Sequence, residues 1–195
     1  MIQSKKDLKD YLEADRIALG RTGKSPSPID LVWQFETSLR KLEYYTNCKK
    51  GLFWKCIRNY YAFKFFGLSV ICGFSIPKNK IGKGLSIAHR GPIIINGGTT
   101  IGDNCRIHVC VNIGTAPGCD NAAPTIGDNV YIAPGVKMYG KIEIASGIII
   151  GANAVVTKSF TESNICIAGV PAKKISDLGR FDIEARNHKS FSNNN

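Results

Sequence analysis

The sequence predicts a mainly β fold, in which a parallel β-helix follows an N-terminal α-helical region. Two observations support this prediction. Aliphatic residues recur every six positions from Ile81 onwards, and small residues follow most of them. Before residue 70 the apolar residues instead recur at the three- and four-residue spacing of helices. We therefore expect a helical region at 1–70, a β-helix at 71–175 and a tail at 176–195.

The first 48 residues are expected to hold two helices. The first lies between a capping Ser4 and a stop at Gly20. Ser27 is expected to cap the second helix, with Pro28 at its first position. Its buried face is predicted from the spacing of Leu31, Val32, Phe35, Leu39 and Leu42.

A third helical stretch, 49–66, interleaves aromatic residues with Lys55, Arg58 and Lys64. It lies in a basic region without any acidic residue between Glu43 and Asp103, in a chain whose formal net charge is +11. Such a field attracts phosphates, anionic lipid headgroups or nucleic acid, and charge alone does not choose among them. The favoured interpretation is a helix packed on the fold with its lysines in solvent, and the alternative is peripheral membrane association through 49–66. We expect no nucleic acid partner.

The six-residue period favours a three-sided coil. Each short face points one aliphatic side chain inward, and a small residue follows where the backbone bends. The period breaks twice: around Gly97 and Gly98, where two extra residues are expected, and at 115–125, which should leave the coil as a loop. The series comprises Ile81, Ile87, Ile93, Ile101, Ile107, Ile113, Ile126, Ile132, Met138, Ile144, Ile150 and Val156.

Composition restricts the compartment and the chemistry. The apolar run at 65–73 is far shorter than the ~20 residues of a membrane span and lies too far along the chain for a secretory signal. We expect a cytoplasmic protein, peripheral at most to the inner face of the membrane. Seven cysteines without a C-x-x-C motif predict reduced thiols and no metal site.

The repeat region resembles the hexapeptide-repeat acyltransferases, and within them the serine acetyltransferase-like branch. The resemblance rests on Ile81-Gly82-Lys83-Gly84, Ile87-Ala88-His89, Ile126-Gly127-Asp128-Asn129-Val130, the segment 150–156 and Ala168-Gly169-Val170-Pro171-Ala172-Lys173. It implies a left-handed parallel β-helix that assembles as a homotrimer. It also implies that clefts between subunits bind the co-substrate acetyl-CoA.

The resemblance places a catalytic general base at His89, two residues past an inward aliphatic residue. Its imidazole would take the proton of an acceptor hydroxyl and return it to the departing thiolate in a direct transfer. An oxyanion donor is expected among the backbone N–H groups near Gly114. His108 and Asn112 are candidates for substrate binding, although His108 would serve equally well as a solvent-facing residue, and His188 in the polar tail is expected to be inert.

The positions of several residues in the repeat make them candidates for binding acetyl-CoA, through backbone contacts with the pantetheine arm and through cations at the phosphates. The bend in the coil alone would also explain the glycines. The arm residues are Gly114, Pro134, Gly151 and Ala152, the phosphate residues are Lys173 and Lys174, and Lys137 is a weaker candidate.

The departures from the serine branch shape the expected acceptor. The branch has an acidic residue before the catalytic histidine and an Arg-His pair at the end of the long loop that helps hold the amino acid, and here these positions are Ala88, Ala122 and Ala123. A further acidic partner of the histidine is replaced by Phe74. Lost charged partners weaken amino-acid recognition, so the expected acceptor is a sugar hydroxyl of a capsular or exopolysaccharide or of its lipid-linked precursor. A backbone carbonyl, Ser75 or Ser86 would then orient His89.

Other functions remain as alternatives. They are serine O-acetylation, N-acetylation of an amino-sugar nucleotide, and a non-catalytic trimeric scaffold that binds acidic polymer. A three-histidine zinc lyase on the same scaffold is disfavoured, because its ligand set has two histidines a few residues apart whereas His89 and His108 lie nineteen apart.

Overall fold

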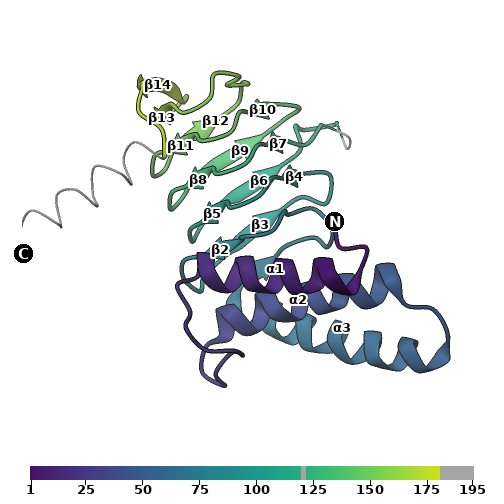
Figure 1. The fold of residues 1–195 in the computed structure, drawn as a ribbon. Coiled ribbons are helices and arrows are strands. Elements are labelled where there is room, and N and C mark those ends of the chain that lie inside the picture. Colours follow the sequence, from purple (N-terminus) through teal and green to yellow (C-terminus); the bar gives the residue numbers. More distant parts are fainter. Residues whose placement is uncertain (120–121, 181–195) are drawn as a thin grey trace, which may run out of the picture.

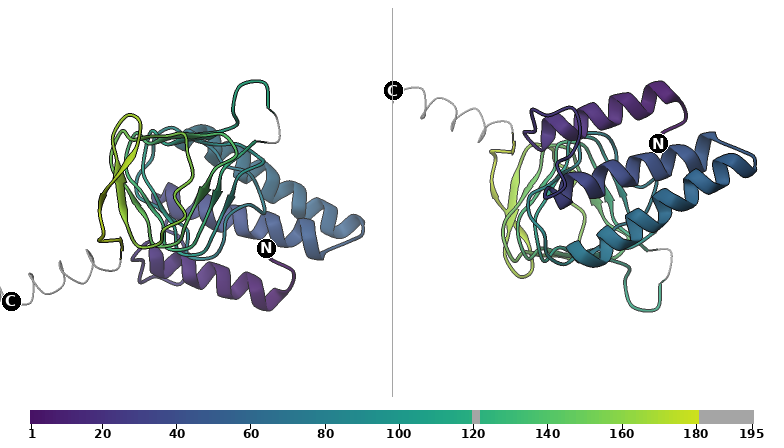
Figure 2. Two further views of the ribbon diagram at one scale, coloured as in Figure 1. Left: turned by 90° about the horizontal axis from the view of Figure 1, so that it is seen from above. Right: turned by 90° about the horizontal axis from the view of Figure 1, so that it is seen from below.

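The computed structural model describes residues 1–119 and 122–180. Three helices lie across one end of a three-sided coil of short strands (Figure 1). They are α1 (Lys5–Ala18), α2 (Leu31–Cys48) and α3 (Leu52–Cys72). Seen along the coil, three walls enclose a common interior, and the described segment that ends at residue 119 projects from one corner (Figure 2). No helix in the described part of the chain is long and apolar enough to cross a bilayer.

Three sheets form the walls, and their strands are parallel except for the final pair, β13 and β14. The first sheet contains β1 (Phe74–Ser75), β3 (Ile93–Ile95), β6 (Asn112–Gly114), β9 (Lys137–Tyr139) and β12 (Val155–Val156). The second contains β4 (Thr100–Ile101), β7 (Thr125–Ile126) and β10 (Glu143–Ile144). The third contains β2 (Ser86–Ile87), β5 (Arg106–Ile107), β8 (Tyr131–Ile132), β11 (Ile149–Ile150), β13 (Cys166–Ala168) and β14 (Lys173–Ser176).

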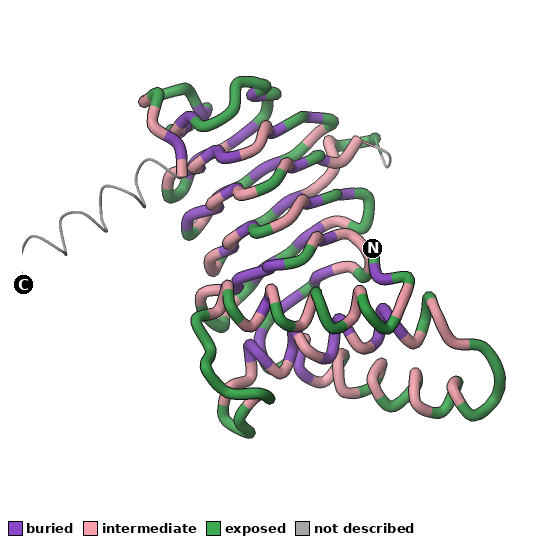
Figure 3. The backbone as a smooth tube through the Cα atoms, viewed as in Figure 1, coloured by how far each residue is buried: buried purple, intermediate pink, exposed green. Residues whose placement is uncertain are grey.

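The six-residue period becomes three columns of buried side chains inside the coil, as predicted. Each column stacks one residue per turn, and its members are at most 9% exposed, so strands as short as two residues are held by a continuous core (Figure 3). The columns are Ile81, Ile101, Ile126, Ile144 and Phe160; Ile87, Ile107, Ile132, Ile150 and Ile167; and Ile95, Ile113, Met138 and Val156.

The register corrects the position of the first insertion. Ile87 pairs with Ile107, and Ile95 pairs with Ile113. The first coil therefore takes eight positions from Ile87 to Ile95, whereas the second takes six from Ile107 to Ile113. The two extra residues therefore lie in the corner at 89–91 and not at Gly97 and Gly98. The expectation was wrong because Ile93 and Ile95 both point inward, so the sequence pattern alone did not show which of them continues the column. The loop expected after Ile113 is present.

The helices cover the open end of the first coil. A strand edge there would leave backbone N–H groups without partners, and buried carboxylates from α1 and α2 accept three of them. Asp15 Oδ1 accepts from Leu85 N at 2.9 Å, and Glu36 Oε1 accepts from Ile87 N at 3.0 Å. Glu43 Oε1 accepts from Asn79 N at 2.6 Å.

Arg40 links two of these carboxyl groups, those of Asp15 and Glu43, to the coil. Its fully buried guanidinium lies 2.7 Å from Asp15 Oδ2 and 3.3 Å from Glu43 Oε2. It also donates to the carbonyl oxygens of Ile81 at 2.9 Å and Gly82 at 2.6 Å. The helical region and the first coil therefore share one buried polar network.

Two expected helix boundaries are wrong. The second helix begins at Leu31 and is capped by Asp30, whose Oδ1 accepts from Trp33 N at 3.2 Å, and not by Ser27. The third helix continues past Phe66 to Cys72, where Gly73 ends it at a φ of 77°. An added Cβ at Gly67 would meet nothing within 4 Å, and the helix passes through this glycine without interruption.

Candidate functional site

His89 lies in the corner formed by the two extra residues between β2 and β3. Gly91, at a φ of 137°, donates its N–H to Cys72 O at the end of α3, at 3.0 Å. A Cβ at Gly91 would approach the Val109 side chain to 3.3 Å, so the corner sits tightly on the next coil. His89 therefore lies on an inserted corner that is held at Gly91 by the end of α3 and by the next coil.

The His89 side chain is exposed and borders an open hollow of about 590 Å³. The rest of the lining comes from the end of α3 and from Arg90 and Gly91. Among the described residues, no hydrogen bond reaches the imidazole and no carboxylate lines the hollow. Both ring nitrogens are thus accessible to an incoming substrate.

Neither serine suggested as a partner of His89 contacts it. Ser86 is buried, and its Oγ accepts from Arg106 Nη1 at 3.0 Å. Ser75 borders a separate hollow of about 450 Å³ beside α3. Phe74, at the position where an acidic partner was expected, lies in the core with its ring centroid 4.9 Å from that of Phe35.

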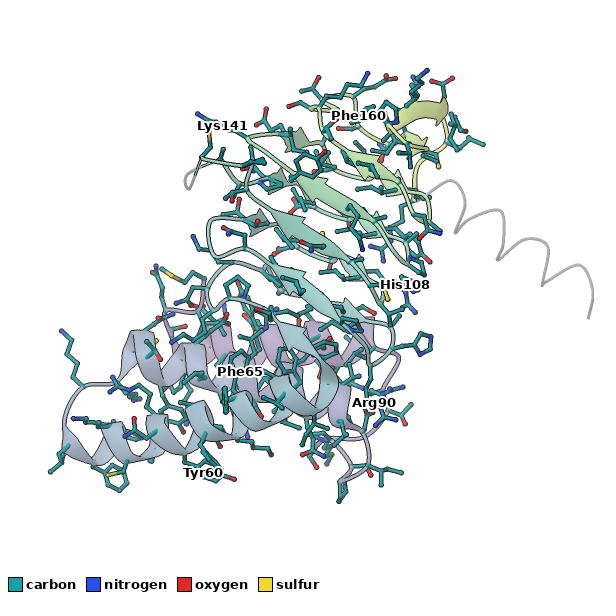
Figure 4. All side chains as sticks on the ribbon, turned by 180° about the vertical axis from the view of Figure 1, so that it is seen from behind. Tyr60, Phe65, Arg90, His108, Lys141 and Phe160 are labelled. Carbon is teal, nitrogen blue, oxygen red and sulfur yellow. The ribbon has the colours of Figure 1, made fainter. Side chains whose placement is uncertain are left out.

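His108 lies one coil further along the same edge of the prism, where Figure 4 labels it together with Arg90. Its ring packs on Tyr131 with centroids 5.0 Å apart. Burial, and then the electrostatic effects of Arg106 and His89, lower the pKa of His108, which favours the neutral form of its imidazole. The Nε2 atom of His108 is buried without a hydrogen-bond partner in the described part of the chain.

Asn112, Gly114 and Lys137 come together at a third hollow of about 420 Å³, with Thr115 and Tyr139 beside them. Lys137 Nζ donates to Cys110 O at 2.5 Å, which fixes the side chain across the wall. Within one chain this hollow shares no lining residue with the one at His89. The structure therefore brings these three predicted residues together but separates them from His89.

The remaining candidates for binding acetyl-CoA lie at two other locations. Pro134, Gly151 and Ala152 lie on successive corners above His89, and Gly151 N donates to Ile167 O at 2.8 Å. Lys173 and Lys174 lie on β14, at the far end of the prism. Lys174 Nζ is already paired with Glu162 at 2.6 Å and Asp177 at 2.5 Å, whereas Lys173 is exposed and has no salt bridge within the described ranges.

Sequence reasoning missed Arg90, the exposed cation next to His89 in the same hollow. The eight-residue spacing from Ile87 to Ile95 was the available signal, since it places the insertion at this corner. No three His, Cys, Asp or Glu residues cluster as a metal site in the part of the chain that the structure describes. His188 and the end of the expected tail lie outside the described residues.

Residues 123–158 match the family described as bacterial transferase hexapeptide (six repeats). The structure resembles serine acetyltransferases from Brucella abortus strain S19 (TM-score 0.67, 23% identity, 90% of this chain and 71% of that chain) and Neisseria gonorrhoeae (TM-score 0.66, 22% identity, 93% and 70%). It also resembles a serine acetyltransferase in complex with CoA (TM-score 0.68, 22% identity, 88% and 71%). The fold is therefore the left-handed parallel β-helix of hexapeptide-repeat proteins, as predicted.

Curated relatives match just over half of the chain. The serine acetyltransferase of Staphylococcus epidermidis RP62A is 40% identical over 116 residues, which are 59% of this chain and 54% of the relative. That of Staphylococcus aureus Mu50 is 41% identical over 104 residues, or 53% and 48%. The chain thus spans about half the length of the curated relatives it matches.

These relatives correct the expected acceptor. They are named serine acetyltransferases, which contradicts the expectation of a polysaccharide hydroxyl and favours the alternative of serine O-acetylation. The expectation rested on lost charges at Ala88, Ala122 and Ala123. It gave no site role to Arg90, which directly follows the histidine and lines the same hollow.

Proposed function

We propose that this chain is an acetyl-CoA-dependent O-acetyltransferase that acts on the hydroxyl of L-serine, with His89 as the general base. One observation carries the proposal. An exposed histidine whose ring nitrogens make no hydrogen bond with the described residues lies beside a cation in a corner hollow of a hexapeptide prism, and a serine acetyltransferase is 40% identical to this chain over 116 residues.

The reaction needs one proton acceptor and no covalent enzyme intermediate. The neutral imidazole of His89 removes the proton from the serine hydroxyl as its oxygen attacks the thioester carbonyl. The new C–O bond forms, the C–S bond breaks, and the imidazolium returns the proton to the CoA thiolate. Burial lowers the pKa of His108 and so favours its neutral imidazole, which does not repel the serine ammonium.

Arg90 supplies the charge that the acceptor requires. Its guanidinium can donate two parallel hydrogen bonds to the serine carboxylate while the hydroxyl faces His89. Ala88, Ala122 and Ala123 supply no charge for the ammonium group. The proposal therefore includes weaker serine binding than in an enzyme with charged residues at those positions.

Acetyl-CoA is proposed to lie along the corner row of Pro134, Gly151 and Ala152, with its phosphates toward Lys173. Gly114, Asn112 and Lys137 border a separate hollow in one chain. We propose that a neighbouring copy in a homotrimer brings this wall opposite His89. A molar mass from light scattering that corresponds to a monomer, in a sample that is active, would overturn the shared site.

The test is an acetyl-transfer assay on the purified protein. Loss of thioester absorbance and mass spectrometry of the product are suitable measurements, because exposed Cys56, Cys110 and Cys119 would react with thiol reagents. L-serine should give O-acetylserine and free CoA in equal amounts, whereas O-methylserine, which has no hydroxyl, should give neither. Absence of O-acetylserine with saturating L-serine would refute the proposal.

A further inference from the structure

Helix α3 presents an apolar face to solvent along its whole length. The exposed stripe consists of Leu52, Phe53, Tyr60, Phe63, Phe66, Val70 and Ile71, each 60–79% exposed. In Figure 3 most of this helix is coloured as exposed or intermediate. Contiguous apolar surface of this size marks an interaction site in a soluble protein.

The opposite face of α3 already accounts for the packing of the helix. Phe65 stacks on Phe35 with ring centroids 5.2 Å apart, and Tyr61 stacks on Tyr45 at 5.4 Å. Leu68 is 7% exposed. The stripe is therefore a second apolar face that the described residues of the chain leave uncovered.

Cations border the stripe. At 100° per residue, Lys55 lies at one margin of the stripe and Lys64 at the other, and exposed Lys50 precedes the helix. No acidic residue occurs between Glu43 and Asp103. Two copies packed through this face would bring like charges together without a counter-charge. The charge pattern thus opposes a second copy and favours an anionic surface.

The shape identifies that surface. The stripe is a convex helical ridge about 30 Å long, from 20 residues at 1.5 Å each, with large apolar residues in the centre and lysines at the margins. This arrangement suits a helix that lies in the plane of a bilayer interface, with its apolar side chains among the acyl chains and its cations at the headgroups.

We propose that α3 docks this chain on anionic lipid bilayers through the exposed stripe and its flanking lysines. Val70 and Ile71, at the end of the stripe, also line the hollow that contains His89. Docking therefore places the mouth of that hollow at the membrane surface. The contact needs no acetyl transfer, so it can be tested separately from the proposed function.

The test is co-sedimentation of the full chain with vesicles of phosphatidylglycerol and phosphatidylcholine, and with phosphatidylcholine alone. The wild type should bind the anionic vesicles and dissociate progressively with salt. Phe53→Ser, Tyr60→Ser and Phe63→Ser together should weaken partitioning at least about tenfold. The matched control replaces three exposed apolar residues elsewhere, Ile17, Ile29 and Ile175, with serine, and should bind like the wild type.

A second pair of variants tests the charges. Each cation near an anionic bilayer is worth about a fivefold change in partitioning, so Lys50→Gln, Lys55→Gln and Lys64→Gln together should weaken it by about 100-fold. The same substitution at Lys5, Lys6 and Lys141 should have a much smaller effect. Circular dichroism checks that each variant is folded.

Three results would overturn the proposal. The first is absence of binding to anionic vesicles. The second is equal binding by the stripe variant and its control. The third is light scattering without lipid in which the wild type has twice the mass of the stripe variant, because a second copy would then cover the stripe.

Discussion

Replacing Arg40 with methionine should destabilise the protein strongly, because Arg40 balances buried charge between the helices and the coil. Its guanidinium is fully buried, 2.7 Å from Asp15 and 3.3 Å from Glu43. Although burial opposes the charged form, the two carboxylates outweigh it and raise the pKa of Arg40 above its usual value. Methionine would leave both carboxylates without a counter-charge and the carbonyls of Ile81 and Gly82 without this donor.

The expected cost is about 3–5 kcal/mol, the usual range when one partner of a buried ion pair is removed. At roughly 2–4 °C per kcal/mol for a chain of this size, the Tm should fall by about 6–20 °C. The assay is urea and thermal unfolding at one fixed protein concentration, because assembly would otherwise contribute to the apparent stability.

The matched control is Arg16→Met. Arg16 pairs with Glu13 at 2.6 Å on the surface of α1, and exposed pairs contribute about 0–1 kcal/mol. Adding Asp15→Asn to Arg40→Met should recover part of the loss, since it removes one uncompensated charge. Equal losses for Arg40→Met and Arg16→Met would refute the proposed role of the buried network.

Three further changes have defined outcomes. Burial and then the charge of Asp15 raise the pKa of Glu36 well above its usual value, so the folded protein holds this proton more tightly than the unfolded chain. The contribution of Glu36 to the free energy of unfolding is therefore full below about pH 4.3 and is lost as pH rises through the raised pKa. Glu36→Gln, which keeps an oxygen for Ile87 N, should therefore gain stability relative to the wild type as pH rises, and parallel curves of unfolding free energy against pH would contradict this. Gly67→Ala should stabilise by about 0.5–1 kcal/mol, because the added Cβ meets nothing within 4 Å in a helix interior, and a lower Tm would be the opposite result. Arg90→Gln should raise the KM for L-serine about 10- to 100-fold with a smaller change in kcat, as expected for a lost charge-assisted pair, and initial rates with an unchanged KM would exclude Arg90 from carboxylate binding.

The repeat was predictable because each inward position is chemically distinctive. One aliphatic residue per face followed by a small residue defined the columns of Ile126, Ile132 and Met138 without any tertiary information. The corner at 89–91 was harder, because Ile93 and Ile95 are both buried and only strand pairing shows which one continues a column.

The helical cap was not predictable for a different reason. The helices that carry Asp15, Glu36 and Glu43 have ordinary amphipathic patterns. These side chains are buried because they accept hydrogen bonds from backbone N–H groups of the first coil, up to about seventy residues later in the chain. The Asp30 cap was missed because Ser27-Pro28 is an equally good local signal. In the structure, Asp30 N donates instead to Ser27 O.

The acceptor was the least predictable feature. Three alanines showed which charges were missing from the expected positions, but the expectation built on them gave no weight to Arg90, which directly follows His89 and lines the same hollow. A substrate inferred only from lost residues neglects cations that the fold brings into the same hollow.

The most direct test of the proposed function compares the rates at which wild-type protein and His89→Ala form O-acetylserine from acetyl-CoA and L-serine. The substitution changes an exposed side chain outside the buried columns, so mass, circular dichroism and acetyl-CoA binding should be unchanged. The rate should fall by ~10²–10⁴-fold, the usual contribution of a general base, and His108→Ala should have a smaller effect. Near-normal turnover by His89→Ala, together with loss of turnover in His108→Ala, would contradict the account and move the base to the next coil.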